Sequence, residues 1–252
     1  MEKLTIIIPT FNEEDFIEGA LETASFADEI IVIDSYSTDK TSELVKNYNV
    51  VFIQHLFDNF SSQRYFAAKH ATNDMILFVD ADERISNLLK AEIQGILKLD
   101  DPYSGYEIKF SNIFMGRRMK YGGFQNNWKL RLFNKRLCWY DEALLVHEKI
   151  IVLEGKTGRL KNAMDHYTYR SWNHYIKKKQ QYAELQSQEL FKKGIKLNAF
   201  HFVIKPAYRF VYHYVFRGGF LDGFPGFASA FANAYGVNTR YIKLWLLRNS
   251  MK

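Results

Sequence analysis

Three carboxylates follow a short apolar run in the first third of the sequence. Residues 76–79 are Ile-Leu-Phe-Val, and Asp80, Asp82 and Glu83 come directly after them. Carboxylates gathered at the end of a buried strand repel one another unless a cation or a polar ligand lies among them. Because Asp80 and Asp82 are two residues apart, extended backbone points both side chains the same way. This arrangement favours Mg²⁺ or Mn²⁺, with phosphates and water completing the coordination shell.

Two other predicted strands also end in polar residues, at positions 9–13 and 34–37. In an open α/β sheet, ligands bind beyond the carboxyl ends of the strands, so polar residues at three such ends favour one ligand site. A simpler interpretation remains open at each end. An Asp-Ala-Asp triplet is a weak motif, acids after a strand often form a solvated turn, and Asn12, Ser37 and Asp39 are good helix caps.

The elements that would position these residues are predicted from apolar periodicity. We expect strands at residues 4–8, 29–33, 50–53 and 76–79. We expect helices at residues 13–25, from residue 39, at 61–71 and at 87–99, the first of them capped by Asn12. Strands that alternate with helices predict a mostly parallel sheet with helices on both faces. Residues 104–153 predict an antiparallel or mixed addition to that sheet, and the chain beyond residue 171 is mainly helical in pattern.

Charge is unevenly distributed along the 252 residues, whose formal net charge is +6. Residues 1–155 carry 17 Lys and Arg against 24 Asp and Glu, whereas residues 156–252 carry 17 against only 4. Residues 200–235 contain twelve Phe or Tyr, with Lys205, Arg209 and Arg217 among them. Basic and aromatic residues together suit a membrane interface, although a nucleic-acid surface or a packed aromatic layer also fits them.

The rest of the composition excludes several classes of protein. Cys138 is the sole cysteine, which excludes a disulfide framework and a Cys/His metal site. The N-terminus does not begin like a signal peptide, and no uncharged apolar stretch reaches the length of about 18 residues that a spanning helix needs. We therefore expect a cytoplasmic protein.

Three motifs carry a resemblance to a known family. TIIIPTFNEE at residues 5–14, EIIVIDSYSTDKT at 29–41 and ILFVDADE at 76–83 resemble the family 2 glycosyltransferases, which have the GT-A fold. VHEKI at 146–150 and GFLDGFPGF at 219–227 resemble, more narrowly, bacterial lipopolysaccharide inner-core β-glucosyltransferases. The resemblance implies an α/β, Rossmann-like mixed sheet flanked by helices, with a helical, basic-aromatic extension. It implies a catalytic domain at residues 1–165 and a membrane-proximal extension at 166–252.

The resemblance also implies which residues bind the nucleotide of a UDP-sugar. The first motif would line the nucleotide pocket through Pro9, Thr10, Asn12 and Glu13. Asp34 would accept a hydrogen bond from the uracil ring, and Asp80 would reach the ribose or the water shell of the metal. Arg64, with Gln63, opens the predicted helix at 61–71, whose N-terminal dipole favours a phosphate. A solvated helix face explains these last two residues equally well.

The metal and the catalytic base are implied in the same way. Asp82 would bind Mg²⁺ or Mn²⁺ directly, and His166 matches a later histidine that joins the metal or the phosphates, although a lone histidine is more often structural. An inverting transferase needs a base to take the proton of the acceptor hydroxyl. Glu148, beside His147, fills the place of that base, with Asp141 and Glu142 as alternatives. The sugar would be read by the variable middle of the chain, around Arg117, Tyr121, Gly122, Trp128 and Arg131.

The implied function is a metal-dependent, inverting transfer of a hexose, with glucose favoured, from a UDP-sugar to a lipopolysaccharide core or a similar lipid-linked saccharide. Such an enzyme would lie peripherally on the cytoplasmic face of the inner membrane and would have no nucleic-acid partner. One alternative is a family 2 enzyme that acts on a polyprenyl phosphate or another envelope glycan. Another is a non-catalytic protein that binds membrane or nucleic acid on a degenerate GT-A fold.

Overall fold

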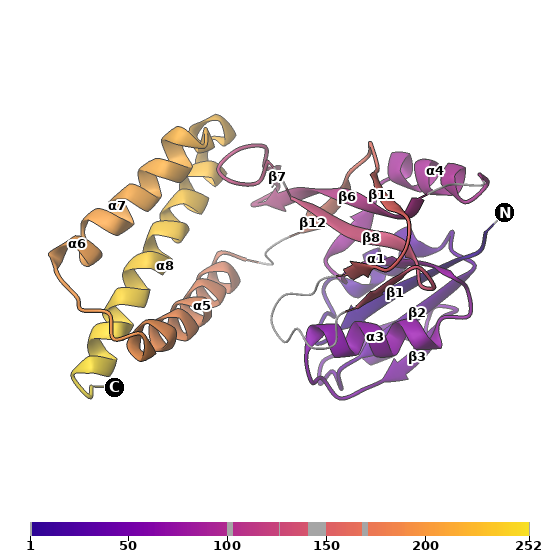
Figure 1. Cartoon of the computed structure of the whole chain (residues 1–252), viewed down its shortest axis with the longest axis horizontal. Helices are drawn as coiled ribbons and strands as arrows, with labels where there is room; N and C mark the ends of the chain where they lie inside the picture. Colours follow the sequence, from indigo (N-terminus) through magenta and orange to yellow (C-terminus); the bar gives the residue numbers. More distant parts are fainter. Residues whose placement is uncertain (1, 100–102, 126, 141–149, 168–170, 252) are drawn as a thin grey trace. The chain divides into compact units, whose positions relative to one another are not determined.

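The computed structural model describes residues 2–99, 103–125, 127–140, 150–167 and 171–251, and these form two compact units (Figure 1). Unit 1 comprises Met1–Phe110 and Asn127–His166, and unit 2 comprises Ser111–Asn126 and Tyr167–Lys252. A segment from the middle of the chain therefore groups with the C-terminal helices. The division into domains at residues 165 and 166 stays a prediction.

Unit 1 is built on four parallel strands in the order β3-β2-β1-β4. These strands are β1 (Leu4–Thr10), β2 (Glu29–Asp34), β3 (Val51–Gln54) and β4 (Met75–Phe78). Strand β1 lies between β2 and β4, and its register with β2 runs from Thr5 opposite Glu29 to Thr10 opposite Asp34. The carboxyl ends of β1, β2 and β4 consequently meet at one edge of the sheet, which confirms the predicted parallel arrangement.

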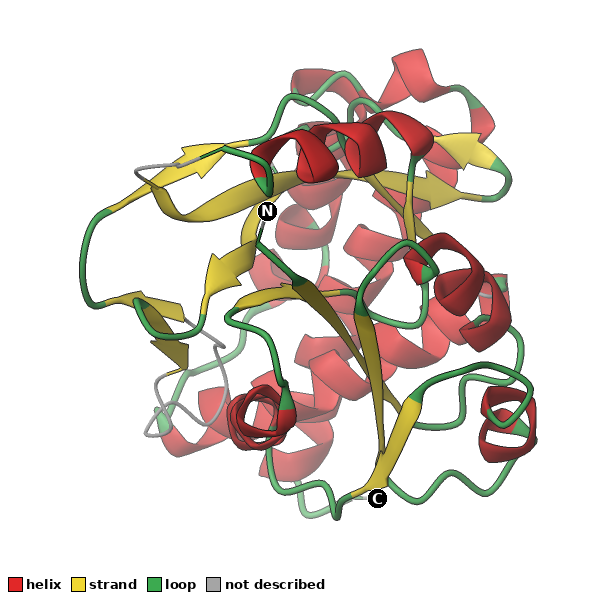
Figure 2. Cartoon of the chain, turned by 90° about the vertical axis from the view of Figure 1, so that its right-hand side faces the viewer, coloured by secondary structure: helices red, strands yellow, loops and turns green. Residues whose placement is uncertain are grey.

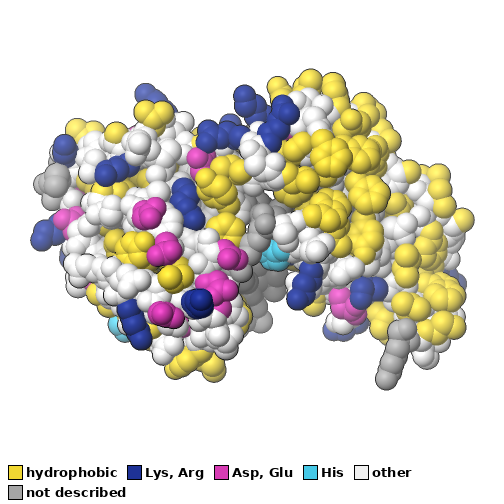
Figure 3. Space-filling model, turned by 180° about the vertical axis from the view of Figure 1, so that it is seen from behind, with side chains coloured by type: hydrophobic (Ala, Val, Ile, Leu, Met, Phe, Trp, Pro, Cys, Tyr) yellow, Lys and Arg dark blue, Asp and Glu magenta, His cyan; other side chains and the backbone are white. Residues whose placement is uncertain are grey.

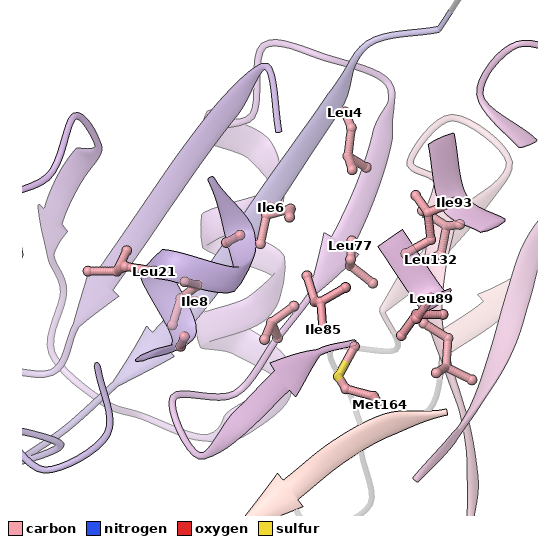
Figure 4. Packing of buried hydrophobic residues seen from close by; sticks show 14 of the residues in the cluster. Leu4, Ile6, Ile8, Leu21, Leu77, Ile85, Leu89, Ile93, Leu132 and Met164 are labelled. Atoms are coloured by element: carbon pink, nitrogen blue, oxygen red, sulfur yellow. The ribbon is translucent and has the colours of Figure 1, made fainter. Parts of the chain in front are cut away.

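Helices cover both faces of this sheet (Figure 2). They are α1 (Ile17–Ala24), α2 (Thr41–Val45), α3 (Phe60–His70) and α4 (Asn87–Ile96). Alternate residues of β1 point to opposite faces, as the pleat requires. Ile6 and Ile8 pack with Leu21 of α1 and with Leu89 of α4 in the larger core (Figure 4), whereas Ile7 packs in a second core with Ala67 and Ala68 of α3.

The predicted cap at Asn12 is wrong. Helix α1 begins at Ile17, and residues 14–16 form a turn in which the Ile17 amide donates to the Glu13 carbonyl. The backbone φ of Asn12 is +55°, in the left-handed region that Asn tolerates better than most residues. Its side-chain oxygen accepts from the Thr38 amide at 2.8 Å, and its own amide donates to Ser37 Oγ at 2.8 Å. Asn12 thus joins the loops that follow β1 and β2.

The antiparallel addition is confirmed. Strand β8 (Trp128–Asn134) lies antiparallel between β4 and β6 (Tyr103–Phe114), and β5 (Glu83–Ile85) pairs antiparallel with β12 (Met164–Tyr167). Strands β7 (Arg117–Arg118) and β11 (Lys156–Arg159) pair with β6, while β9 (Cys138–Tyr140) and β10 (Ile150–Val152) form a separate pair. Cys138 is buried in the second core, and burial raises the pKa of its thiol to about 11.

Unit 2 is mainly helical. It contains α5 (Trp172–Lys192), α6 (Ala199–Phe202), α7 (Ile204–Val211), the π-helix η1 (Tyr212–Phe216), the 3-10 helix η2 (Gly219–Asp222) and α8 (Phe224–Arg248). Helix α8 packs against both α5 and α7. Its core joins Phe114 and Met119 of the middle segment to Tyr175, Ala228 and Ala232. Among the helices of the described residues, none has a stretch long and apolar enough to cross a membrane.

The motif GFLDGFPGF forms the tight connection between η2 and α8. The Asp222 carboxylate is buried and accepts from the Tyr121 amide at 2.8 Å and the Lys120 amide at 3.1 Å. A Cβ atom on Gly226 would lie 1.9 Å from the carbonyl oxygen of Gly219, so only glycine permits this approach. Within unit 2 the motif therefore packs η2 closely against the start of α8, and Asp222 holds the middle segment beside it through hydrogen bonds.

Candidate active site

A cavity of about 1160 Å³ opens in unit 1 at the carboxyl ends of the parallel strands. Its volume lies slightly above the range of about 300–1,000 Å³ typical of small-molecule sites. Phe11, Ser35 and Gln63 contribute to its wall. Among the residues predicted to form the site, the cavity is lined by Pro9, Thr10, Glu13, Arg64, Asp80, Asp82, Trp128 and Arg131.

Asp80 lies between two arginines at the wall of the cavity. Its Oδ1 is 2.6 Å from Arg64 Nη2, and its Oδ2 is 2.7 Å from Arg131 Nη2. Burial alone would raise the pKa of Asp80, but Arg131 and Arg64 together hold it well below its ordinary value. Asp80 is therefore a permanent carboxylate, and both of its oxygens already accept hydrogen bonds from arginine. Its predicted contact with the ribose or the metal's water shell stays a prediction.

Glu83 lies next to Asp80, is fully buried and does not line the cavity. Its Oε1 is 3.0 Å from Arg131 Nη2, and its Oε2 accepts from the Asp80 amide at 2.9 Å. Burial raises the pKa of Glu83 to about 7, against the opposing effect of Arg131. Since both oxygens are engaged, Glu83 holds Asp80 and Arg131 in position.

Asp82 turns toward a different partner. The expectation of extended backbone from Asp80 to Asp82 is wrong, because the Glu83 amide donates to the Asp80 carbonyl and closes a turn. Asp82 Oδ2 consequently lies 3.3 Å from His166 Nε2. His166 is brought there by the pairing of β12 with β5, in which it stands opposite Glu83.

These side chains form a group that suits a divalent cation. One potential ligand atom from each of Asp82, Glu83 and His166 lies within 4.8 Å of the others. Burial tends to lower the pKa of His166, but the hydrogen bond and the charge of Asp82 raise it. Carboxylate oxygen and imidazole nitrogen are common ligands of divalent metals. With Glu83 already engaged, Asp82 and His166 are the two side chains that can turn toward a cation.

Two predicted nucleotide contacts lie away from the cavity wall. The side-chain oxygens of Asp34 are enclosed by the loop that follows β2, where they accept from the Ser37 amide at 2.9 Å and from Gln54 Nε2 at 3.2 Å. Asn12 links the same loop to the end of β1. Both residues shape the loop around Ser35, which does line the cavity. The contact of Asp34 with the uracil ring, and that of Asn12 with the nucleotide, stay predictions.

The residues predicted to recognise the sugar are divided between the two units, and the predicted catalytic base is not described. Trp128 and Arg131 lie on the cavity, while Arg117, Tyr121 and Gly122 belong to unit 2. The predicted base Glu148 and its neighbours Asp141, Glu142 and His147 lie outside the described residues.

Sequence reasoning missed the role of Glu83 and of Lys129. Lys129 lines the cavity from the same strand as Arg131, two residues earlier, with its Nζ 5.1 Å from the ring centroid of Phe110. Alternation along the stretch KLRLF was the available signal, because residues two apart in a strand share a face. That signal places Lys129 and Arg131 together on one face.

The chain belongs to glycosyltransferase family 2, because the family model Glycosyl transferase family 2 matches residues 5–153. It is a glycosyltransferase with the GT-A fold, as the resemblance implied. An uncharacterized glycosyltransferase of Rickettsia felis is 30% identical over 100% of this chain and 91% of that protein. The lipopolysaccharide core biosynthesis glycosyltransferase LpsC of Rhizobium meliloti is 24% identical over 92% of this chain and 87% of its own length. The crystal structure of S. aureus TarS 1–349 matches 99% of this chain and 92% of that one, with a TM-score of 0.51 and 17% identity.

Proposed function

We propose that this glycosyltransferase moves a hexose from a UDP-sugar to a hydroxyl group of a lipid-linked saccharide, with inversion at the sugar carbon and with Mg²⁺ or Mn²⁺ as cofactor. The observation that carries the proposal is the pair Asp82–His166, 3.3 Å apart, of which Asp82 lines a cavity large enough for a nucleotide sugar. The similarity to LpsC supports a lipopolysaccharide core as the acceptor.

Asp82 and His166 would hold the cation. The bound cation would neutralise charge on the diphosphate leaving group. Imidazole suits Mn²⁺ better than Mg²⁺, so this pair favours Mn²⁺. Lys129, which is exposed on the cavity wall, would contact a phosphate oxygen directly.

The nucleotide would lie along the carboxyl ends of β1 and β2. Pro9, Thr10 and Glu13 would contact it from the first motif, while Asp34 and Asn12 would shape its pocket. Arg64 and Asp80 would form the wall beside the ribose. On the opposite side of the sugar, Glu148 would take the proton of the acceptor hydroxyl as that oxygen attacks the anomeric carbon and the diphosphate departs.

The acceptor would be reached at the cytoplasmic face of a membrane. Unit 2 exposes many apolar side chains, including Phe216 at 74% and Phe224 at 68% of their surface, and hydrophobic atoms cover much of it in Figure 3. Such a surface on a unit rich in Lys and Arg suits peripheral contact with anionic lipid. Loss of vesicle binding on Phe216→Ser and Phe224→Ser would support this contact. Unchanged vesicle binding would contradict membrane contact and would favour a protein partner for this surface.

Thermal unfolding tests the donor site. Wild type and Asp82→Asn would be compared with UDP, with Mn²⁺ and with both, because a ligand that binds the folded state raises its stability. We expect a shift that needs both ligands and is lost in Asp82→Asn, while Asp74→Asn, a surface acid paired with Arg136, keeps it. The absence of any shift in wild type would contradict the proposed donor site.

Transfer assays test the acceptor and the base. Glu148→Gln should bind UDP as wild type does and lose transfer, and normal transfer would move the base to Asp141 or Glu142. A panel of acceptors separates lipopolysaccharide core from polyprenyl phosphate. Salt-sensitive binding to nucleic acid without any response to UDP would favour the non-catalytic alternative.

A further inference from the structure

A second cavity, of about 480 Å³, lies within unit 2 between helices α5, α7 and α8. Four cationic side chains line it: Lys179 from α5, Lys205 and Arg209 from α7, and Arg240 from α8. Its described lining residues include no carboxylate. We call this cavity the cationic pocket. Cations that converge from three helices without a counter-charge are costly in a stable fold, so the arrangement calls for a functional explanation.

The contacts of these cations are with neutral groups. Lys179 Nζ donates to Asn233 Oδ1 at 2.8 Å, and Lys205 Nζ donates to the Tyr241 hydroxyl at 2.9 Å. Arg240 Nη1 donates to Gln186 Oε1 at 3.0 Å, while its buried Nε has no hydrogen-bond partner among the described residues. Lys179, Lys205 and Arg240 are therefore held in place, but their charges are not neutralised by these contacts, and Arg209 is exposed.

The carboxylates of unit 2 are engaged elsewhere or exposed. The described residues of this unit contain three: Glu184, Glu189 and Asp222. Glu184 bonds Lys243, Asp222 accepts from backbone amides, and Glu189 is exposed. Burial, with the nearby charges of Arg209 and Lys178, lowers the pKa of Lys179 to about 8. The pocket thus holds an excess of positive charge that an anion would relieve.

The shape and donors of the pocket select among anions. A carboxylate presents two oxygens in one plane, whereas a phosphate presents three or more oxygens that can accept from several directions at once. Donors that converge from three helices match the second geometry. Nucleic acid, by contrast, needs an extended groove that follows a backbone. We propose that the cationic pocket binds the phosphate group of a phosphate monoester, at a site distinct from the donor cavity of unit 1.

Calorimetric titration of the full chain with inorganic phosphate and with glycerol 3-phosphate tests this site, in buffer without divalent metal or UDP. Flotation with phosphatidylcholine vesicles, with and without phosphatidic acid, covers a lipid source of the same group. The test variant is Lys205→Gln with Arg209→Gln, which removes two pocket charges from α7. The matched control is Lys177→Gln with Lys192→Gln, two exposed charges of α5 outside the pocket lining. Circular dichroism establishes that both variants fold.

We expect the pocket variant to lose affinity for a phosphate monoester by about tenfold or more, because charge-assisted hydrogen bonds are lost, while the control stays within about twofold of wild type. Loss confined to soluble phosphates identifies a soluble ligand, and loss confined to phosphatidic acid vesicles identifies a lipid headgroup; either supports the site. Equal losses in both variants, or no binding of any probe by wild type, would overturn it. Because the buffer lacks metal and UDP, failure of the proposed donor site leaves this result intact.

Discussion

Arg131 Nη2 lies 3.0 Å from Glu83 Oε1, and these two side chains are 2% and 0% exposed. The same nitrogen lies 2.7 Å from Asp80 Oδ2. One guanidinium on β8 therefore balances two carboxylates that follow β4. Removing one partner from a buried ion pair leaves an uncompensated charge, which costs more than the pair itself contributes. Arg131 thus holds the carboxylates of Asp80 and Glu83 in position.

Arg131→Met should lower the free energy of unfolding by about 3–5 kcal/mol, measured by urea titration. Arg131→Met combined with Glu83→Gln should recover part of that loss, because the buried Glu83 carboxylate that has lost Arg131 is removed, while Asp80 keeps its contact with Arg64. Arg136→Met is the control, since Arg136 is 75% exposed and pairs with Asp74 at the surface. Its effect should stay within about 1 kcal/mol. Similar losses for Arg131→Met and Arg136→Met would contradict the role given to Arg131.

His166→Ala should reduce the preference of the protein for Mn²⁺ over Mg²⁺. The imidazole is a better ligand for Mn²⁺, whereas the carboxylate of Asp82 serves both ions. We expect affinity for Mn²⁺ in the presence of UDP to fall about tenfold or more, and affinity for Mg²⁺ to fall less. Competition titrations followed by electron paramagnetic resonance of free Mn²⁺ measure both. His70→Ala, an exposed histidine of α3, should change neither. Equal losses for the two ions would contradict the predicted preference for Mn²⁺, and unchanged affinity for both would remove His166 from the coordination shell.

Gly226→Ala should destabilise unit 2 by about 3 kcal/mol, because the new methyl group meets the Gly219 carbonyl oxygen and the start of α8 must move. Hydrogen exchange over α7 and α8, measured by mass spectrometry, reports the loss locally. Gly95→Ala in α4 is the matched control, since no atom lies within 4 Å of its added Cβ. A helical alanine there should stabilise unit 1 by up to about 1 kcal/mol. Unchanged exchange in Gly226→Ala would contradict the close packing of η2 on α8.

Phosphate binding to the cationic pocket should weaken as the pH rises through about 8, the pKa of Lys179. Above that pH the Lys179 amine of the free protein loses its proton, whereas a bound phosphate keeps the amine protonated. Binding must therefore be accompanied by uptake of a proton, which weakens it. In the ligand-free protein the lowered pKa of Lys179 makes the folded state more stable as the pH rises, which is opposite to its effect on phosphate binding. Stability is lost as the pH falls from 10.5, the ordinary pKa of lysine, to about 8, because over this range the unfolded chain binds the proton that the buried amine has not yet taken up.

The surroundings of Lys179 leave it as the group that titrates in this range. Burial lowers the pKa of His213 and raises that of Tyr175, so the former is neutral above its ordinary pKa of 6.5 and the latter stays neutral near pH 8. The remaining charged groups near Lys179 are Lys178, Lys205, Arg209 and Arg240. Calorimetry with glycerol 3-phosphate, which is mostly a dianion above pH 7 because its second pKa is about 6, should show the dependence between pH 7 and pH 9 in wild type and lose it in Lys179→Gln. A dependence that persists in the variant would assign the titration to another group.

The parallel half of the sheet was predictable because its strands are apolar runs separated by helical periodicity. The incorrect predictions concern polar side chains that form hydrogen bonds with residues distant in the sequence. Asn12 was expected to cap a helix, but its left-handed backbone turns its side chain toward Thr38. Asp80 and Asp82 diverge because Glu83 closes a turn and draws Asp80 to Arg131.

Long-range contacts account for the rest of what sequence reasoning missed. Glu83 and Arg131 are 48 positions apart, and the insertion of β8 beside β4 is what joins them. Residues 111–126 group with the C-terminal helices because the Asp222 carboxylate binds amides about a hundred positions earlier. Neither contact leaves a periodic signal in the sequence. The resemblance marked GFLDGFPGF as distinctive, and its glycines are explained by the close approach of Gly226 to Gly219 and by the positive φ of Gly223.

The buried thiol of Cys138 makes this chain a convenient background for spectroscopic labels. A thiol reacts as the thiolate, and this thiol is fully buried with a pKa raised to about 11. Maleimide reagents should therefore not react with it at neutral pH. Cysteines introduced at exposed positions, such as Lys98 in unit 1 and Lys192 in unit 2, would then be the reactive sites without any change to the native residue. The distance between a pair of spin labels at those positions, measured with and without a donor nucleotide, would report how the two units respond to that ligand.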